Sequence, residues 1–594
     1  MIVNSAATLK PKAGNEDFAQ FINGHYYYVD KTQYLKEIFS EYNDRLLILR
    51  PRRFGKTLMM STLRHFLEIS KDNPGDTTRQ QKLFKGLRVL GDHEFTSKCM
   101  GQFPVVYFTF NGLDGTDFDS AIANLADKIY RLAAEFEWLL DSDKLNSRQK
   151  KELSKLLDQD LYSGNKAKGL IASSLITLCS LLLTHFNRHP VVLIDEYDVP
   201  LQKAVINGYY QEMLSVIRPL LSQILKGNSD PCKVIMTGCL RASKESIFTG
   251  MNNIEVNTVL NNGNSIATAF GFTPDEVQKM FRYYGFESQY EKARLWYDGY
   301  SIDGNDLFCP WDVCSYCKDL ATSPKAPEQN NFNPRAYWNG SSSNDIIREF
   351  LPFLESGDAD RMEALIKGGS VQLSVSDSLN YGELNEHHSE HFWSVLLYTG
   401  YLTLDKGTSD NNYLFRIPNS EIQECFRDQI TKYYSPNGNG IFANISETIA
   451  REFIEGKQND LLASLSDTLE SFVSVRDSAV RSLKENYYHG FINGLLAPAA
   501  KSKIIRGYSS NMESGDGYPD ITFSDSRNST GTVIELKHVS DRHGLKQAAD
   551  DALSQIISKN YAERLFRDGR TEVTAWGIAF CGRHCDVSFR RLRP

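Results

Sequence analysis

Four short apolar runs, separated by long helical patterns, constrain the first half of this 594-residue chain most strongly. Each run is apolar at consecutive positions rather than at alternating ones, which is typical of strands buried on both faces of a sheet. The runs are 46–49, 105–110, 191–194 and 234–236. Helical patterns such as 119–140 and 169–186 stand between them. The sequence therefore predicts an α/β fold built on a parallel sheet.

The first run leads into residues 50–57, which read RPRRFGKT, and then into a helical pattern over 58–68. A strand, a turn ending in Gly-Lys-Thr and a helix form a phosphate cradle, because backbone N–H groups and the helix N-terminus face the phosphates. Lys56 is expected to reach the β- and γ-phosphate oxygens, and Thr57 to ligate Mg²⁺. The general pattern begins with a glycine, and Arg50 stands in its place.

The third run ends in two acids, Asp195 and Glu196, which supply the second half of such a site. Asp195 would hold Mg²⁺ through water, and Glu196 would polarise the attacking water. Two complementary parts in the right order are more specific than either part alone. The sequence thus predicts a P-loop NTPase in the first half of the chain.

A second constellation lies near the C-terminus, in Asp520 and in the run VIELK at 533–537. Because side chains on a strand alternate, Glu535 and Lys537 should share one face while Leu536 occupies the other. Antiparallel pairing with the preceding strand would bring Asp520 beside them. The expected elements are a helix at 485–496, strands at 503–509, 518–523 and 532–537, a helix at 545–565 and a strand at 573–580.

Two carboxylates and an ammonium at one sheet edge suit the hydrolysis of a phosphodiester bond. Asp520 and Glu535 would hold Mg²⁺, which neutralises charge on the phosphate and helps to generate hydroxide. Lys537 would orient the attacking water or stabilise the developing charge. The alternative is a surface ion pair between Glu535 and Lys537 on an edge strand.

Residues 484–580 resemble the PD-(D/E)XK nuclease domain, of restriction-endonuclease-like αβββαβ fold, found at the C-terminus of bacterial AAA-ATPase-like proteins. The resemblance rests on ENYYHG at 485–490, SNMESG at 510–515, Asp520, ELK at 535–537 and ALSQI at 552–556. It implies Glu485 and Glu513 as further acidic metal ligands, although a helix N-terminal carboxylate and a loop charge are the alternatives. It also places Gln555, Lys559 and Tyr561 on the helix after the catalytic lysine.

Residues 18–260 resemble the AAA-ATPase-like family itself. The shared segments are YVDKT at 28–32, PRRFGKT at 51–57, IDEYD at 194–198, Thr237-Gly238 and SIFTGMNN at 246–253. An arginine-rich cradle is usual in that family, so the resemblance implies that nucleotide is bound by Arg52, Arg53, Phe54, Gly55, Lys56, Thr57 and Asp195. It places Thr237 where a γ-phosphate sensor would be. Arg241 is then a sensor, a finger or a plain surface arginine, and Tyr197 and Asp198 pack or cap the strand end.

The part between the two constellations is helical and aromatic. A helix ending near Gly400, a strand at 401–404, a polar turn and a strand at 413–417 are compatible with a winged-helix-like unit. The cluster at 435–440 is typical of a linker. We expect four segments, namely a P-loop AAA-ATPase-like domain (1–272), a middle region (273–440), a helical connector (441–483) and a nuclease domain (484–594).

Composition adds few exclusions. The net charge of −8 does not exclude nucleic acid, because only the contacting face must be basic. Basic stretches occur at 50–56, 501–506 and 583–593. Cys314 and Cys317 form a CxxC without a second pair, so we predict reduced thiols on a helix, with no zinc site and no disulfides. No apolar run approaches the roughly 20 residues of a membrane span, and the N-terminus lacks a secretory pattern, so we expect a cytoplasmic protein without a membrane partner.

The sequence favours an ATP-regulated, Mg²⁺-dependent nuclease with ATP and Mg²⁺ as cofactors and DNA as the expected substrate. The alternative is a nucleotide-dependent regulatory switch that binds nucleic acid or protein without cleaving. The choice between DNA and RNA, between endonuclease and exonuclease, and between monomer and homo-oligomer stays open.

Overall fold

The structure is a computed structural model, and it divides into two compact units. The first comprises 1–342 and 370–424, and the second comprises 343–369 and 425–594. The residues that the structure describes are 9–14, 16–40, 44–162, 164–226, 231–241, 253–261, 263, 265–322, 332–338, 358–366, 368–376, 389–405, 413–433, 441–472, 485–510, 519–527 and 529–594. The four segments expected from the sequence stay a prediction.

A five-stranded parallel sheet in the order β2-β3-β4-β1-β5 forms the core of the first unit. Its strands are β1 (Arg45–Leu49), β2 (Val105–Thr109), β3 (Val191–Asp195), β4 (Lys233–Gly238) and β5 (Glu255–Asn257). Every residue of β1, β3 and β4 is buried, as the consecutive apolar pattern predicts. The short and polar β5 shows no apolar run, so the sequence pattern missed it. Because β1, β4 and β3 are parallel neighbours, the loops after β1 and β3 lie at the same end of the strands, on either side of β4.

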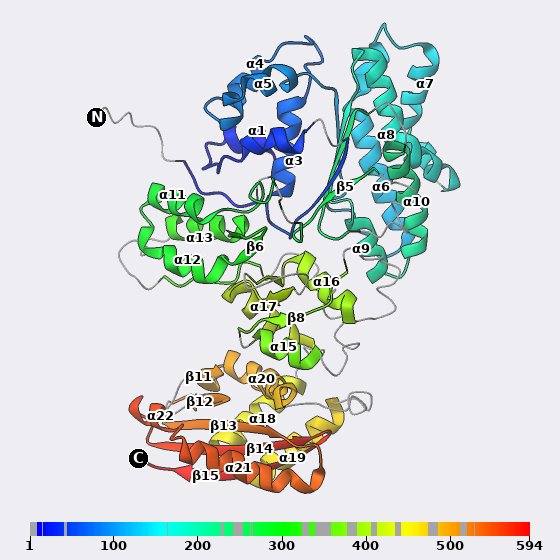
Figure 1. The fold of residues 1–594 in the computed structure, drawn as a ribbon. Coiled ribbons are helices and arrows are strands. Elements are labelled where there is room, and N and C mark those ends of the chain that lie inside the picture. Colours follow the sequence, from blue (N-terminus) through cyan, green and yellow to red (C-terminus); the bar gives the residue numbers. More distant parts are fainter. Residues whose placement is uncertain are drawn as a thin grey trace, which may run out of the picture. The chain divides into compact units, whose positions relative to one another are not determined.

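Helices cover both faces of this sheet. In Figure 1, α3 lies against one face, and α6, α8 and α10 lie against the other. The helices of this part are α1 (Phe18–Asn23), α2 (Leu35–Ile38), α3 (Lys56–Leu67), α4 (Thr78–Leu83), α5 (His93–Cys99), α6 (Phe118–Ala134), α7 (Ser147–Leu156), α8 (Gly164–Phe186), α9 (Val199–Ile206) and α10 (Tyr210–Leu225). The predicted helix at 119–140 is thus shorter, because the chain turns after Ala134 into a 3-10 segment.

Helix α8 corrects one expectation from the sequence. Its stretch Lys166–Phe186 is long and apolar enough to cross a membrane by length and composition alone. The helix packs against α6, α7 and α10, and 44% of its most apolar window is buried. A core helix of this kind passes the same test, so the finding is weak evidence for a membrane span.

The middle region adds small helices and strands to the first unit, which ends within the last helix of this region. Its elements are α11 (Pro274–Tyr284), α12 (Tyr290–Tyr297), β6 (Tyr300–Ile302), β7 (Asn305–Leu307), α13 (Pro310–Thr322), β8 (Val371–Gln372), α16 (Ser389–Thr399), β9 (Thr403–Leu404), β10 (Leu414–Arg416) and α17 (Ser420–Tyr433). Helix α16, the hairpin β9–β10 and helix α17 follow the helix–hairpin–helix order expected for this part. The strand β8 adds to the hairpin, which gives an antiparallel sheet in the order β8-β10-β9. Cys314 and Cys317 are buried thiols in the apolar core around α13, as predicted.

The second unit contains α15 (Asp358–Ile366) and a five-stranded mixed sheet. The strand order is β11-β12-β13-β14-β15, and only the β13–β14 pairing is parallel. The strands are β11 (Ile505–Ser510), β12 (Ile521–Asp525), β13 (Thr530–His538), β14 (Glu572–Cys581) and β15 (His584–Leu592). The helices are α18 (Ile441–Glu455), α19 (Gln458–Phe472), α20 (Glu485–Lys501), α21 (Leu545–Ser558) and α22 (Glu563–Arg567).

Two details differ from the expected αβββαβ order. The predicted helix at 545–565 is two helices, because the chain turns at Asn560, whose φ is 52°. The strand β15 also extends the sheet beyond β14. Helix α21 packs very close to β14, since a Cβ on Gly577 would lie 2.1 Å from the Ala549 carbonyl oxygen.

The opposite face of the sheet is covered by α18, α19 and α20 (Figure 1). Phe453 of α18 is fully buried, its ring meets that of Trp576 edge to face at 5.4 Å, and its carbonyl oxygen accepts from the indole N–H at 3.0 Å. The segment expected to be a connector therefore contributes to the core of the sheet.

Replacing Phe453 by alanine should lower the free energy of unfolding of the second unit by about 3–5 kcal/mol, because it opens a cavity against the sheet. Urea denaturation of the full chain measures the change. The exposed Thr448 on the same helix is the control, and Thr448→Ala should stay within about 0.5 kcal/mol of wild type. Equal stability of the two variants would contradict the packing role of α18.

Candidate active sites

The loop between β1 and α3 forms a compact cradle. Gly55 has a φ of 84° and Arg53 a φ of 67°, so the backbone turns twice through the left-handed region before α3 begins at Lys56. The buried Lys56 ammonium donates to the carbonyl oxygens of Arg50 and Pro51 at 3.0 and 2.9 Å. Successive N–H groups at a helix N-terminus with one lysine are the elements of an anion site.

Asp195 connects this cradle to the neighbouring strands. Its Oδ2 accepts from the Thr57 hydroxyl at 2.8 Å, and its Oδ1 accepts from the Thr237 hydroxyl at 2.5 Å. Burial raises the pKa of Asp195, while the two hydroxyls and the Lys56 charge oppose the rise. The structure thus brings together four residues that the sequence predicted for one site.

Glu196 follows directly and is only half-buried. Its φ of 55° is uncommon for a residue with a side chain and is typical of strained positions at functional sites. Burial, followed by the Asp195 charge, raises the pKa of Glu196 to about 7. A carboxylate with such a pKa suits proton transfer near neutral pH.

Tyr197 and Asp198 serve the structure of the strand ends. The Tyr197 hydroxyl donates to the Leu240 carbonyl oxygen at 2.7 Å. Asp198 accepts from the backbone N–H groups of Cys239 and Leu240 at 3.1 and 2.8 Å. Both side chains therefore fix the chain after β4, which is the packing and capping role considered from the sequence.

Arg50, the residue in place of the first glycine, is fully buried. Its guanidinium donates to Asn257 Oδ1 at 2.7 Å, to the Asn257 carbonyl oxygen at 3.3 Å and to the Ile266 carbonyl oxygen at 3.3 Å. Burial lowers the pKa of Arg50 to about 9. The side chain therefore ties the cradle to β5.

The other bulky side chains of the loop are held by the protein as well. Arg52 donates to Gln202 Oε1 at 3.0 Å. Arg53 donates to the Tyr337 carbonyl oxygen at 2.9 Å, and Phe54 is buried. The nucleotide-binding role expected of these three residues stays a prediction.

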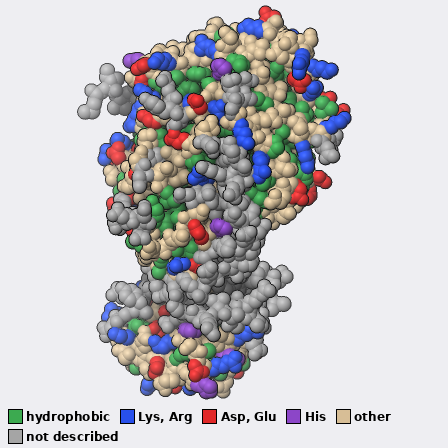
Figure 2. Space-filling model, turned by 45° about the vertical axis from the view of Figure 1, so that its right-hand side comes forward, with side chains coloured by type: hydrophobic (Ala, Val, Ile, Leu, Met, Phe, Trp, Pro, Cys, Tyr) green, Lys and Arg blue, Asp and Glu red, His purple; other side chains and the backbone are tan. Residues whose placement is uncertain are grey.

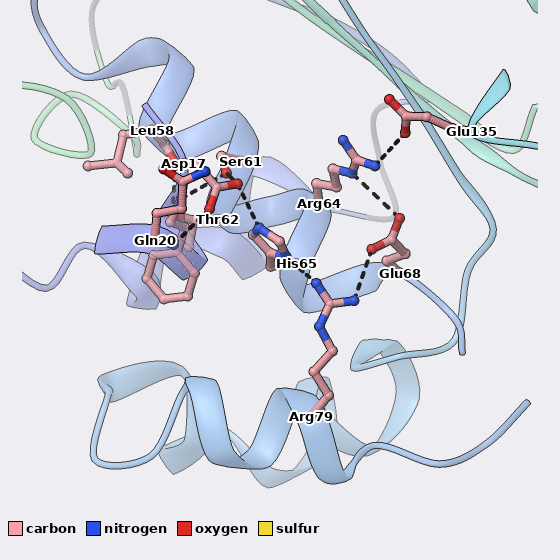
Figure 3. A network of polar contacts seen from close by, with 11 residues as sticks. Asp17, Gln20, Leu58, Ser61, Thr62, Arg64, His65, Glu68, Arg79 and Glu135 are labelled. Atoms are coloured by element: carbon pink, nitrogen blue, oxygen red, sulfur yellow. Dashed lines mark hydrogen bonds and ion pairs between the residues drawn. The ribbon is translucent and has the colours of Figure 1, made fainter. Parts of the chain in front are cut away.

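A polar network fixes the far end of α3 (Figure 3). His65 Nε2 lies 3.0 Å from Asp17, which caps α1, and Arg79 lies 3.0 Å from His65 Nδ1. The preceding residue, Arg64, pairs with Glu135 at 2.7 Å. These contacts join α3 to the elements around it and leave its first turn to the cradle.

The YVDKT segment at 28–32 is structural. Asp30 accepts from the Thr32 hydroxyl and from the Arg88 N–H. Lys31 is buried and pairs with Glu276 at 2.7 Å. This segment holds the chain around the sheet and lies outside the candidate site.

The second candidate site lies on β13 and the residue before β12. Ile521 pairs with Ile534 in antiparallel register, so Asp520 stands opposite Glu535. The Asp520 Oδ2 accepts from the Leu536 N–H at 2.7 Å. The structure therefore brings Asp520 beside β13, as the sequence analysis expected.

The alternation on β13 is also as expected. Leu536 packs into the core under α18 and α20, whereas Glu535 and Lys537 face α21 on the other side. Gln555 of α21 joins the two, because its amide N–H donates to Glu535 Oε1 and its Oε1 accepts from the Lys537 ammonium at 3.0 Å. Glu535 is buried, with 5% of its surface exposed, which argues against a solvated ion pair on an edge strand.

Sequence reasoning gave no role to His489, which lies next to this site. His489 Nε2 is 3.1 Å from the Asp520 carbonyl oxygen and 3.1 Å from the Ser510 hydroxyl. Tyr561 lies 3.4 Å from the Gln555 amide, whereas Lys559 is exposed at the end of α21. The position of His489 within the ENYYHG segment was the signal for it.

The donor set suits a hard divalent cation. Mg²⁺ binds through one or two carboxylates, with water and substrate phosphate in the remaining positions. Asp520 and Glu535 supply two carboxylates at facing positions beside two neighbouring strands, so the residues fit Mg²⁺. The described residues contain no cluster of three or more His, Cys, Asp or Glu side chains that would form a cage made by protein alone.

Several predicted site residues lie outside what the structure describes. Glu513 falls in the segment 511–518, and Glu485 begins α20 with a side chain that is not described. Residues 246–252 are also outside the described part. Arg241 follows β4 and is half-buried.

Comparisons with known proteins match the two candidate sites to two different families. Residues 12–248 match the family of predicted AAA-ATPases, and residues 483–589 match the PD-(D/E)XK nuclease superfamily. A curated protein of Azotobacter chroococcum mcd 1, described as "Uncharacterized protein in vnfD 5'region", is 24% identical over 436 residues, which cover 71% of this chain and 70% of the relative. The two family matches confirm both resemblances and indicate ATPase and nuclease activity in general terms.

Replacing Arg50 by glycine restores the general cradle pattern but should lower the free energy of unfolding by about 3 kcal/mol or more, because the buried polar partners of Arg50 lose their donor. Thermal or urea unfolding of the full chain measures this loss. Arg52→Gly in the same loop is the control, with an expected loss of about 1 kcal/mol. The structural role of Arg50 is wrong if both glycine variants are equally stable.

Proposed function

We propose that this chain is an ATP-regulated, Mg²⁺-dependent nuclease that hydrolyses phosphodiester bonds of DNA in the cytoplasm. ATP would bind in the cradle before α3, and the phosphodiester bond would be cleaved at the edge of β13. The observation that carries the proposal is the meeting of Asp520, Glu535 and Lys537, with Gln555 between the last two.

Each residue of the nuclease site has a task that follows from its chemistry. Asp520 and Glu535 would hold Mg²⁺, which supplies Lewis-acid activation of the phosphate and lowers the pKa of bound water. Lys537 would orient the attacking water or offset charge on the phosphate oxygens. Gln555 keeps both Glu535 and Lys537 in place through one amide group. His489 would hold the backbone at Asp520.

The ATPase site divides its work in the same way. The cradle N–H groups and Lys56 would bind the β- and γ-phosphates, and Thr57 with Asp195 would hold Mg²⁺. Glu196 would polarise the attacking water, and Thr237 would contact the γ-phosphate. Thr57 and Thr237 both donate to Asp195, which supports a common task for the three residues.

Nucleic acid as the substrate is supported by the site rather than by a broad basic surface. On the face drawn in Figure 2, Lys and Arg side chains are interspersed with Asp and Glu. Of the basic stretches, 50–56 contains the buried Arg50 and Lys56 and is therefore no solvated surface. The net charge of −8 likewise gives no support for a broad basic surface. Nucleic acid would therefore bind mainly near the cleavage site.

Glu535→Gln and Asp520→Ala should each reduce Mg²⁺-dependent cleavage of labelled DNA at least about 100-fold, because each removes a carboxylate from the metal site. Both single-stranded and double-stranded DNA and RNA serve as substrates in the assay, and EDTA should abolish cleavage. ATP hydrolysis by both variants should equal that of wild type.

The matched control is Glu572→Gln, which changes a carboxylate of the same sheet that pairs with Arg591 and Arg593. Its cleavage rate should equal that of wild type. A wild-type protein that binds nucleic acid without Mg²⁺-dependent cleavage would refute the nuclease and favour a regulatory switch. Cleavage of RNA alone would correct the substrate.

ATP regulation predicts a one-way dependence between the sites. Lys56→Ala should abolish ATP hydrolysis and also change the rate of DNA cleavage, whereas Asp520→Ala should leave ATP hydrolysis intact. Cleavage and hydrolysis are measured on the same preparations with and without ATP. Equal nuclease rates for wild type and Lys56→Ala would show that the two activities are independent.

A further inference from the structure

The Arg53 side chain ends in a pocket that the middle region of the same unit builds. Its guanidinium donates to the Tyr337 carbonyl oxygen at 2.9 Å and lies 3.9 Å from the Asp312 carboxylate. The rings of Trp311 and Trp338 each lie with their centroids 5.1 Å from the guanidinium carbon. Only 10% of the Arg53 side chain is exposed, and Asp312 is buried, so this contact differs from a solvated surface pair.

A pair of buried carboxyl groups completes the pocket. Glu421 accepts from the backbone N–H groups of Tyr337 and Trp338, the latter at 2.7 Å, and it lies beside the Asp312 carboxyl. Burial, and then the Asp312 carboxyl, raises the pKa of Glu421, and burial raises the pKa of Asp312. Because two adjacent buried carboxyl groups do not both ionise, at least one of the two keeps its proton near neutral pH.

The pocket acts on the backbone of the cradle. Arg53 has a φ of 67°, a conformation that is strained for a residue with a side chain and persists only where the surroundings hold it. The next two residues, Phe54 and Gly55, lead directly into Lys56 and the first N–H groups of α3. Anchoring the Arg53 side chain therefore fixes the orientation of the N–H groups that would face phosphate.

We propose that Trp311, Asp312, Trp338 and Glu421 are positioning residues for ATP binding, because they hold Arg53 and with it the phosphate-binding backbone. The inference rests on the proposed ATP-binding function and adds the middle region to the nucleotide site. These residues act through Arg53 and carry out no step of hydrolysis themselves. Nucleotide affinity should therefore depend on them far more than the rate of hydrolysis at saturation.

Glu421→Ala in the full chain tests this role. The variant leaves two N–H groups without their acceptor and releases the segment that bonds Arg53, so KM for ATP should rise about tenfold to a hundredfold. The value of kcat at saturating ATP should stay within about twofold of wild type. Glu421→Gln keeps the acceptor oxygen and can donate to Asp312, so it should restore KM to within about threefold.

Trp338→Leu is a second variant that keeps the backbone acceptor and removes only the ring over Arg53, and it should also raise KM. Glu276→Gln is the control for the loss of a partly buried carboxylate, since Glu276 pairs with the buried Lys31. It should lower Tm without changing KM. An equal rise of KM in Glu276→Gln and Glu421→Ala would overturn the positioning role.

Hydrogen exchange without nucleotide separates this inference from the proposed function. The amides of residues 50–57 should exchange faster in Glu421→Ala than in wild type and Glu421→Gln. Unchanged exchange together with a wild-type KM would overturn the positioning role. A wild-type protein that neither binds nor hydrolyses ATP would instead overturn the proposed ATPase.

Discussion

The arrangement of the first unit depends on one buried carboxylate, that of Asp195. Its two oxygens accept from Thr57 on α3 and Thr237 on β4, and because β4 separates β1 from β3, these bonds tie together the ends of three strands. A charge in such a place is costly, which is why burial raises the pKa of Asp195. The strand order brings the two hydroxyls within reach of the Asp195 carboxylate. The carboxylate in turn joins the ends of the strands in that order.

The second unit reaches a comparable arrangement through strand alternation and helix approach. Period-two geometry puts Glu535 and Lys537 on one face of β13, but it leaves their mutual orientation undecided. Gln555 decides it, because one amide both donates to the acid and accepts from the ammonium. Helix α21 can carry that amide close enough because Gly577 presents no Cβ to the Ala549 carbonyl.

The parts that sequence reasoning predicted are those set by local pattern. Strands β1 to β4 are apolar because they are buried on both faces, and Asp520 was placed by antiparallel register. Strand β5 was not predicted because it has no apolar run of its own. Only its pairing with the neighbouring strand β1 identifies it. The split of the helix after Lys559 depends on one left-handed asparagine, which a periodic pattern does not reveal. The packing of Phe453 on Trp576 joins residues far apart in the chain, so no local pattern contains it.

The arginines of the cradle have protein partners that the sequence does not reveal. In the sequence they belong to a basic stretch at 50–56, and the family resemblance implies that Arg52 and Arg53 bind nucleotide. In the structure each guanidinium is bound by protein groups, and Arg50 is buried completely. The side chains of Arg50 and Arg53 therefore determine the shape of the loop, whose backbone N–H groups and Lys56 are the elements of an anion site. These two side chains contact elements far along the chain, so the geometry of the cradle depends on β5 and on the middle region.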